Sequence, residues 1–343
     1  MKLKFICTTL LILSFLSGRA QIGGESTYQF LELSNSARIA ALGGTQVAVN
    51  DSTDLNLPFY NPSLLTKNMS NQLLFNYVDY LSDINFGYAS YARSFEGIGN
   101  FAAGIHYINY GKFTETTENG VITGNEFKAA EYALNFIYSN RYERLRYGAI
   151  LKPVLSIFES YRSFGIAADL GVGYSSKNGL TMVGITAKNI GTQITTYYQN
   201  GKREPIPFDL DAGISGKLAH APAIIYVTVQ HLNHWTLAKP ESTSSNTTDI
   251  IIYQPQESVG KQIMRHLVIG VELLPSKNFT LRAGYNYERR QELALTDRTS
   301  TVGFSVGFGV HVNRFSFDFG TTRFHLAGSS NLFSLAINLN QNF

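Results

Sequence analysis

Hydrophobic residues alternate with small or polar residues from about Leu73 to the end of the chain. In segment 164–174, Phe, Ile, Leu, Val and Tyr occupy most alternate positions, and Gly, Ala and Asp lie between them. Segment 302–312 places Val and Phe on one face and Gly, Ser and His on the other. Because successive side chains of a β-strand point to opposite faces, each such segment predicts a strand with one apolar face.

The pattern predicts fourteen strands, most of them about 10 to 12 residues long. They span residues 73–80, 84–95, 99–111, 127–139, 144–155, 164–174, 180–190, 207–218, 222–232, 265–275, 279–288, 301–312, 314–324 and 332–343. A tilted strand needs about 9–11 residues to cross a bilayer, whereas strands of soluble proteins have about 5–6 residues. The strand lengths and the even strand number are typical of a bacterial outer-membrane barrel.

The connections between these strands are sorted by length. Those after even-numbered strands are short turns, near residues 97, 141, 176, 220, 276 and 313. Most of those after odd-numbered strands are longer, at residues 112–126, 156–163, 191–206, 233–264, 289–300 and 325–331. Outer-membrane barrels have short periplasmic turns and longer extracellular loops, whereas a soluble sandwich gives no reason for such sorting. We therefore predict an all-β fold: a 14-stranded antiparallel transmembrane β-barrel over residues 71–343, in the cell outer membrane, with both termini periplasmic.

The last strand and the aromatic residues fit this prediction. Leu339 and the terminal Phe343 share an apolar face, which looks like the insertion signal of outer-membrane barrels, although Gln341 interrupts that face. Tyrosines at strand ends are expected to form interfacial girdles; they are Tyr77, Tyr80, Tyr107, Tyr110, Tyr138, Tyr285 and Tyr287. The polar run Ser242–Thr248 predicts a solvated, mobile surface loop.

The first seventy residues do not alternate in this way. Residues 1–20 resemble a secretory signal peptide, with Lys2 and Lys4 before a short apolar core and small residues before Gln21. A membrane anchor is the competing interpretation, but the apolar stretch is short for one. Residues 21–70 contain many turn formers and a predicted short helix at residues 36–44, which ends at glycine. We expect this segment to plug the barrel lumen or to lie beneath it in the periplasm; a loosely ordered tail is the alternative.

Composition excludes several classes of protein. Charged residues make up only 15 % of the chain, against about 25 % in soluble proteins. No apolar run of about 18 residues follows the leader, which excludes a polytopic helical membrane protein. The chain has 28 basic and 25 acidic residues, and three of the basic ones (Lys2, Lys4 and Arg19) lie in the leader, so the remainder carries no net charge. Bulk charge therefore gives no support for nucleic acid as a partner.

Three short motifs resemble sites with chemistry, and we expect none of them to carry it. The hydrolase pattern G-x-S-x-G occurs at residues 303–307, but it lies in mid-strand, away from the strand-to-helix elbow that the reaction requires. The S-x-x-K pattern at residues 258–261 lacks an accompanying Lys-Thr-Gly. His231 and His234 lack an obvious third metal ligand.

The only cysteine, Cys7, lies in the leader and offers the mature chain no nucleophile or disulfide. The sequence thus predicts no enzyme activity, no cofactor and no metal. The charged run at residues 288–292 is expected to be a solvated loop face; contact with a partner or with lipopolysaccharide is the alternative.

A family resemblance begins in the N-terminal segment. Residues 28–44 (YQFLELSNSARIAALGG), the Asn50-Asp51 pair and the turn 61–63 (NPS) resemble the start of the PorQ and PorV family. The residues that carry the family pattern are Ala41, Leu42, Gly43, Gly44, Asn61 and Pro62, together with Asn189 and Gly191 in the run 188–191 (KNIG). The third turn residue departs from the family's usual Asn-Pro-Ala, and segment 76–87 is similar to the first hairpin of the PorQ branch.

The PorQ and PorV proteins are outer-membrane barrels of the type IX secretion system and are related to the FadL fatty acid transporters. The resemblance implies a non-enzymatic scaffold of the cell-surface attachment complex, with PorZ-like, PorU-like and PorV-like partners. It also implies contact with outer-membrane lipid, and lipopolysaccharide is a further candidate contact. Two other functions stay open. One is a FadL-like transporter of hydrophobic molecules, with a lateral opening at a kinked strand. The other is a PorV-like shuttle for secreted cargo.

Overall fold

The computed structural model describes residues 26–117, 119–120, 122–199, 201–237, 241–244, 250–253, 257–293, 301–325 and 328–340. The predicted signal peptide, residues 1–20, and the terminal Phe343 lie outside the described residues. Within the described part of the chain, no helix is long and apolar enough to span a membrane.

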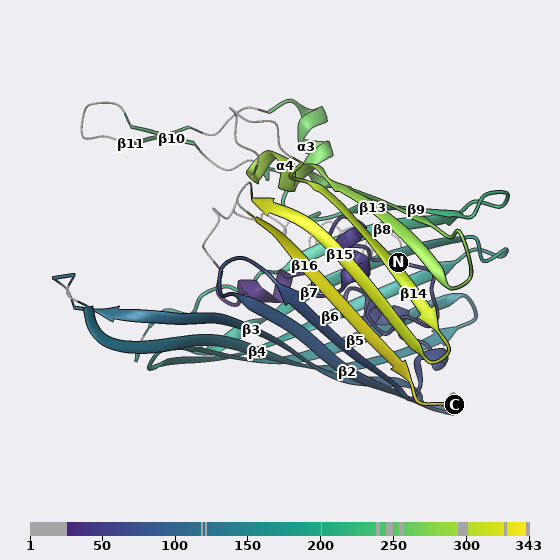
Figure 1. Ribbon diagram of the computed structural model, residues 1–343, viewed down its shortest axis with the longest axis horizontal. Coiled ribbons are helices and arrows are strands. Elements are labelled where there is room, and N and C mark those ends of the chain that lie inside the picture. The colour runs from purple at the N-terminus through teal and green to yellow at the C-terminus, as the bar shows by residue number, and fades with distance from the viewer. Residues whose placement is uncertain are drawn as a thin grey trace, which may run out of the picture.

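Fourteen antiparallel strands form a closed barrel, in which the first strand pairs with the last (Figure 1). The strands are β1 (Gln72–Asp79), β2 (Asn85–Phe95), β3 (Gly99–Thr116), β4 (Ile122–Tyr142), β5 (Leu145–Phe158), β6 (Tyr161–Ser175), β7 (Thr181–Thr195), β8 (Asp209–Lys217), β9 (Ala223–Val229), β12 (Leu267–Leu273), β13 (Phe279–Asn286), β14 (Phe304–Val312), β15 (Phe315–His325) and β16 (Gly328–Asn338). Each overlaps one of the fourteen predicted segments.

The strands run further at the loop end than the sequence pattern indicated. The predicted loop 156–163 is a tight turn, because β5 and β6 stay paired up to Phe158 and Tyr161. The predicted loops 112–126 and 325–331 are also shortened by pairing, in β3–β4 and β15–β16. Beyond Asn109, the β3–β4 hairpin has neither β2 nor β5 as a sheet neighbour for most of its length, and it projects past the barrel (Figure 1).

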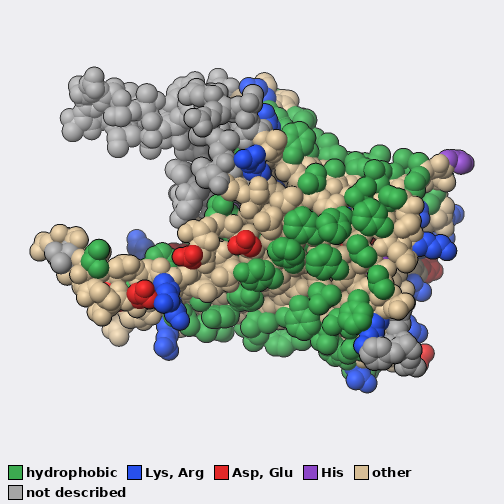
Figure 2. Space-filling model, in the orientation of Figure 1, with side chains coloured by type: hydrophobic (Ala, Val, Ile, Leu, Met, Phe, Trp, Pro, Cys, Tyr) green, Lys and Arg blue, Asp and Glu red, His purple; other side chains and the backbone are tan. Residues whose placement is uncertain are grey.

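The outer surface of the barrel is apolar. Side chains such as Phe75, Phe136 and Leu170 point outward and are about half exposed, at 48 %, 50 % and 54 %. Figure 2 shows such side chains as a broad hydrophobic area over the strands on the face in view. An exposed apolar band of this kind is stable only against lipid, so the chain is a transmembrane barrel.

Residues 26–71 lie inside the barrel (Figure 1). They form η1 (Gln29–Glu32), α2 (Ala37–Ala41), η2 (Leu57–Phe59), η3 (Pro62–Leu64) and η4 (Lys67–Met69). Ser36 caps α2, its side chain accepting a hydrogen bond from the Ile39 N–H. Gly43, with a φ of 107°, follows the helix, which confirms a short helix ending at glycine. We call residues 26–71 the inner segment.

The hydrophobic core lies in the lumen, between the inner segment and the strands. Phe30, Ile39, Leu57 and Leu64 are almost fully buried there, although they belong to a segment with little regular structure. They pack with lumen-facing strand residues such as Tyr88. The barrel wall thus supplies the apolar contacts that the inner segment cannot make by itself.

The long connections carry extra elements at the loop end. The connection after β9 contains β10 (Glu241–Ser244), β11 (Ile250–Tyr253) and α3 (Val259–His266), and α4 (Tyr287–Leu293) follows β13 (Figure 1). The predicted loop at residues 242–248 was wrong for residues 242–244, which pair with β11, and residues 245–248 lie outside the described residues.

Two sequence interpretations of polar side chains also need correction. Glu288 and Arg289 do not lie on a solvated face: the Glu288 side chain is only 13 % exposed, and Arg289 donates to Thr322 of the barrel wall. Tyr110 is not a lipid-facing girdle residue, because its hydroxyl donates to the buried Glu131 at 2.5 Å. Both corrections reflect groups that turn into the lumen.

Candidate functional site

The α2 helix lies directly on lumen-facing glycines of β12–β15. A Cβ atom on Gly307 would come within 2.6 Å of Ala41 Cβ, and one on Gly270 within 2.9 Å of the Leu42 carbonyl oxygen. A Cβ atom on Gly284 would overlap backbone atoms of Leu42 and Gly43. The small face of these strands therefore lets the helix approach the wall at backbone distance.

Polar contacts fix the same helix. The Ala37 N–H donates to Ser334 Oγ at 3.0 Å, and the Ser305 hydroxyl donates to the Ala41 carbonyl at 3.3 Å. Ser305 is the central residue of the G-x-S-x-G match. Its position in β14, against α2, gives it a structural contact rather than the exposed elbow of a hydrolase.

The Asn-Pro-Ser turn rests on a second group of glycines. A Cβ atom on Gly148 of β5 would come within 2.6 Å of the Pro62 carbonyl carbon, and one on Gly171 of β6 within 2.8 Å of Pro62 Cδ. Asn61 is fully buried; its side chain accepts from the Ser63 N–H at 3.0 Å and donates to the Val47 carbonyl at 2.8 Å. Asparagine thus closes the turn and ties it to the neighbouring backbone.

The KNIG run forms a bulge in β7. The register between β6 and β7 shifts between Ala168 and Leu170, and Asn189 has a φ of 56°. Asn189 accepts from Lys152 Nζ at 3.0 Å and donates to the Pro207 carbonyl at 3.0 Å. A Cβ atom on Gly191 would overlap the backbone of β6. These two residues therefore bend the strand and hold the bend.

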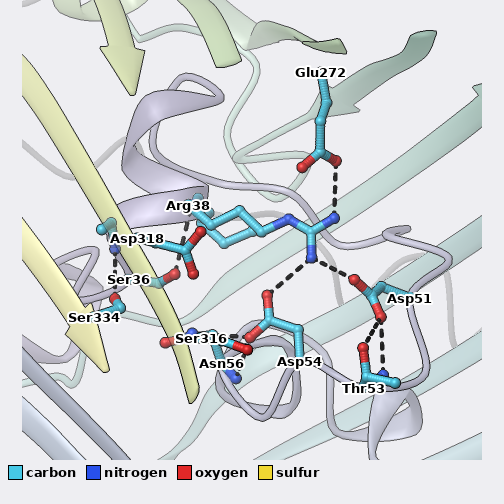
Figure 3. A network of polar contacts seen from close by, with 12 residues as sticks. Ser36, Arg38, Asp51, Thr53, Asp54, Asn56, Glu272, Ser316, Asp318 and Ser334 are labelled. Carbon is cyan, nitrogen blue, oxygen red and sulfur yellow. Dashed lines mark hydrogen bonds and ion pairs between the residues drawn. The ribbon is translucent and has the colours of Figure 1, made fainter. Parts of the chain in front are cut away.

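A buried ion network joins the inner segment to the wall (Figure 3). Arg38 of α2 contacts Asp51 at 2.6 Å, Asp54 at 3.0 Å and Glu272 of β12 at 2.8 Å. Glu272 also accepts from Arg282 of β13, which in turn contacts Asp318 of β15. The network thus pairs charged side chains of the inner segment with those of β12, β13 and β15.

The charges in this network depend on one another. Burial opposes the charged form of Arg38, but the carboxylates of Glu272 and Asp51 raise its pKa well above the usual value. Burial likewise acts against ionised Asp51, and Arg38 with two Thr53 hydrogen bonds lowers its pKa to about 2. Arg38 is therefore the group that keeps the Asp51 carboxylate ionised.

A cavity of about 360 Å³ lies between the inner segment and the wall, at the end that carries α4. Its apolar lining includes Leu31, Leu33, Phe59 and Phe86. Its polar lining includes Glu32, Lys152, Lys188, Asp209, Gln230, His231, Asn286, Glu288 and Arg289. We call it the loop-end pocket. A pocket with one apolar side and one charged side suits an amphipathic molecule.

His231 and Glu288 form the charged rim of the loop-end pocket. His231 Nδ1 lies 3.0 Å from Asp209 Oδ1, and its Nε2 lies 3.6 Å from Glu288 Oε2. Burial lowers the His231 pKa, but Asp209 and Glu288 outweigh burial and raise it to about 10. Burial raises the Glu288 pKa to about 7, even though His231 opposes this rise. The rim therefore changes charge within the physiological pH range.

Two further cavities open at the opposite end, on the far side of the inner segment. One of about 700 Å³ is lined by residues such as Arg38, Lys217 and Lys277, and one of about 190 Å³ is lined by Asp54 and Arg314 among others. Arg38 and Asp51 line both. The ion network thus forms the floor of the lumen at the turn end.

The structure places the predicted family residues at two contacts between the inner segment and the wall and at one bulge within the wall. Ala41 to Gly43 contact β12–β14, and Gly44 lies beside Arg289 of α4. Asn61 and Pro62 contact β5 and β6, and Asn189 and Gly191 lie in the bulge of β7. Leu339 follows β16, and its side chain is 49 % exposed. Its proposed pairing with Phe343 in an insertion signal stays a prediction.

Sequence reasoning missed the partners of the buried charges. Asp169, Glu272, Arg282 and Asp318 each stand on the small or polar face of an alternating strand, which places them in the lumen. The spacing of these residues in the sequence does not predict which of them forms an ion pair with Arg38 or Lys152. Among the described residues, no group of three or more His, Cys, Asp or Glu could hold a metal ion.

Comparisons with known proteins identify the fold. No family model and no curated protein matches the sequence. The structure of the Pseudomonas putida toluene transporter TodX aligns with a TM-score of 0.50 and 14 % identity, over 88 % of this chain and 96 % of that chain. A deltaS2 mutant of TodX, described as a monoaromatic hydrocarbon channel, gives a TM-score of 0.51 and 14 % identity, over 89 % and 98 %.

A Pseudomonas aeruginosa FadL homologue aligns with a TM-score of 0.47 and 12 % identity, over 93 % of this chain and 100 % of that chain. At these identities the likeness concerns the fold alone. The predicted fold class, a 14-stranded antiparallel transmembrane β-barrel, is confirmed.

Proposed function

We propose that this chain is a non-enzymatic outer-membrane barrel that takes up hydrophobic molecules carrying a polar group. The observation that carries the proposal is the loop-end pocket, with Leu33, Phe59 and Phe86 on one side and Lys188 and His231 on the other. An apolar body lies against the first side, and a polar group lies against the second. The TodX structures, named as a toluene transporter and a hydrocarbon channel, have the same kind of fold.

The route out of the pocket is the second step of the proposal. The inner segment fills the lumen between the loop-end pocket and the turn-end cavities. A ligand in the pocket therefore has no direct path along the barrel axis to the periplasm. The bulge at Asn189 is the kinked strand at which we propose a lateral exit. The proposal places the long loops at the cell exterior and both termini in the periplasm.

Ligand analysis of the purified barrel tests this function. The protein is extracted in mild detergent, and bound small molecules are identified by mass spectrometry of the intact complex. We expect an apolar or amphipathic ligand in the native protein and its loss in Leu33→Trp, which fills the pocket. Leu134→Trp is the matched control, because Leu134 is 44 % exposed on the outer surface. Equal ligand retention by both variants would contradict the pocket assignment.

A second candidate function is supported by a different observation. The β3–β4 hairpin projects beyond the barrel, and residues 28–87 contain the motifs that resemble those of the PorQ and PorV family. We propose, as the alternative, a type IX secretion scaffold that anchors a PorZ-like protein beside PorU-like and PorV-like partners. A PorV-like cargo shuttle is the related third possibility.

Affinity purification from solubilised outer membrane separates these functions. Near-stoichiometric recovery of PorZ-like and PorU-like proteins supports the scaffold, and recovery of secretion cargo in cells without the PorU-like protein supports the shuttle. A barrel recovered alone with an apolar ligand supports transport. The scaffold also predicts that shortening the β3–β4 hairpin abolishes recovery, whereas Leu33→Trp leaves it unchanged.

A further inference from the structure

Basic side chains without partners gather at the turn end of the barrel. Arg141, Arg144, Lys177, Lys217 and Lys277 lie in or beside the short turns, where Figure 2 shows several Lys and Arg side chains together. Within the described part of the chain, none of these five side chains has a hydrogen-bond or ion-pair partner.

The cations inside the lumen, in contrast, have carboxylate partners. Arg38, Lys152, Lys188 and Arg282 each contact at least one carboxylate at 3.2 Å or less. Among the described residues, the short turns at the turn end contain only two acidic residues, Glu96 and Glu143. This rim therefore carries an excess of positive charge, which attracts anions from outside the chain.

One groove at this rim combines charge with apolar surface. It has a volume of about 320 Å³ and is lined by Tyr142, Glu143, Arg144, Leu145, Tyr174 and Lys177. It joins the turn between β4 and β5 to the turn between β6 and β7, since Leu145 pairs directly with Tyr174. Tyr142, Leu145 and Tyr174 are exposed on the lipid-facing side, at 72 %, 42 % and 50 %.

We propose that this groove binds the head group of an anionic phospholipid in the membrane leaflet on the turn side. Its phosphate lies between Arg144 and Lys177, and its acyl chains follow the apolar outer surface past Leu145. Tyrosines at this depth are the residues that membrane interfaces favour. Basic clusters at a bilayer surface attract anionic lipids by charge.

The charge of the groove determines the class of lipid. Arg144 and Lys177 contribute two positive charges and Glu143 one negative charge, so the lining is balanced by a head group with a single net negative charge. A glycerol head group such as that of phosphatidylglycerol meets this condition. An ethanolamine or choline head group adds an ammonium that the two cations repel.

Native mass spectrometry of the full mature barrel tests the site. The wild type, Arg144→Gln/Lys177→Gln and a control, Lys217→Gln/Lys277→Gln, are each titrated with phosphatidylglycerol, phosphatidylethanolamine or lipopolysaccharide. The control removes two equally unpaired cations from other turns. We expect phosphatidylglycerol to bind the wild type and the control alike, and the groove variant to lose about tenfold in affinity.

Three results would overturn the proposal. They are unchanged phosphatidylglycerol binding by the groove variant, an equal loss in the control, and stronger binding of phosphatidylethanolamine or lipopolysaccharide than of phosphatidylglycerol. The substituted side chains are exposed and the turns keep their backbone bonds, so folding is checked simply by the heat-dependent gel mobility of the barrel. A variant that fails this check is replaced by Arg144→Gln alone, with an expected loss of about threefold.

Discussion

Single glycines decide how closely the inner segment lies against the wall. Sequence alternation predicted strands with one apolar face, and the structure shows that the opposite face lines the lumen and explains why small residues are needed there. Gly284 and Gly307 leave space for the backbone and side chains of residues 41–43. Alternation alone could not show which glycines face a helix, because that depends on the path of residues 26–71.

Adding one methyl group at such a glycine should loosen the inner segment. In Gly284→Ala the new Cβ overlaps backbone atoms of Leu42 and Gly43, so we expect a loss of about 1–3 kcal/mol in the free energy of unfolding. Gly216→Ala is the matched control, because a Cβ atom there meets nothing within 4 Å. Thermal melting and protease cleavage within residues 26–71 measure the difference. Equal melting temperatures and cleavage rates of the two variants would show that the inner segment does not depend on close packing against Gly284.

Arg38 is the second residue whose role is testable by itself. Its removal in Arg38→Met leaves Asp51, Asp54 and Glu272 close together without their shared cation. Breaking a buried ion pair from one side costs about 3–5 kcal/mol, so we expect residues 26–71 to exchange amide hydrogens faster. Lys112→Met serves as control, since Lys112 forms an exposed pair with Glu126 and should change little. Unchanged exchange in Arg38→Met would show that the network does not hold the segment.

At the scale of elements, the sequence predicted the barrel wall better than its ends. The wall follows from period-two alternation, which is a local property of the chain. The ends depend on whether neighbouring strands continue to pair, as at Phe158 and Tyr161, and pairing is a tertiary property. The sequence pattern likewise did not predict the bulge at Asn189, although the KNIG run lies at its position.

The end of the β3–β4 hairpin extends beyond the barrel and adds nothing to its closed sheet. Residues 110–128 pair only within the hairpin, because β2 pairing stops at Asn109 and β5 pairing starts at Ala129. Replacing residues 112–127 by a two-residue Asn-Gly turn should therefore leave folding intact. Heat-dependent mobility of the unboiled protein on a gel measures this. A barrel that no longer folds would show that the projecting strands are needed during assembly.

At the scale of the whole molecule, the loop end should respond to pH through His231. Its pKa rises from 6.5 to about 10 in the folded protein, so its stabilising contribution is complete below pH 6.5 and is lost as the pH rises through 10. Trp235, the only tryptophan of the chain, lies nearby against His266 and reports on this region by fluorescence. We expect a transition near pH 10 that is absent in His231→Gln, whereas a change near pH 7 from Glu288 remains. His220→Gln, at the opposite end, should retain the transition near pH 10.

The inner segment makes the lumen of this barrel a set of separate cavities rather than a pore. The loop-end pocket of about 360 Å³ and the turn-end cavity of about 700 Å³ lie on opposite sides of residues 26–71, whose apolar side chains form the core between them. A barrel of fourteen strands is wide enough to conduct ions once such a filling is removed. We therefore expect the wild type to conduct few ions, because residues 26–71 fill its lumen.

Deleting residues 27–70 should convert the protein into an open channel. The exposed lumen would be lined by Lys152, Asp169, Arg282 and Asp318, whose charges favour water over lipid. We expect steady ion currents in planar bilayers for the deletion variant and only rare openings for the wild type. Gly284→Ala should lie between them, because it loosens the segment without removing it. If the deletion variant folds but conducts no better than the wild type, the wall itself, and not the inner segment, closes the lumen.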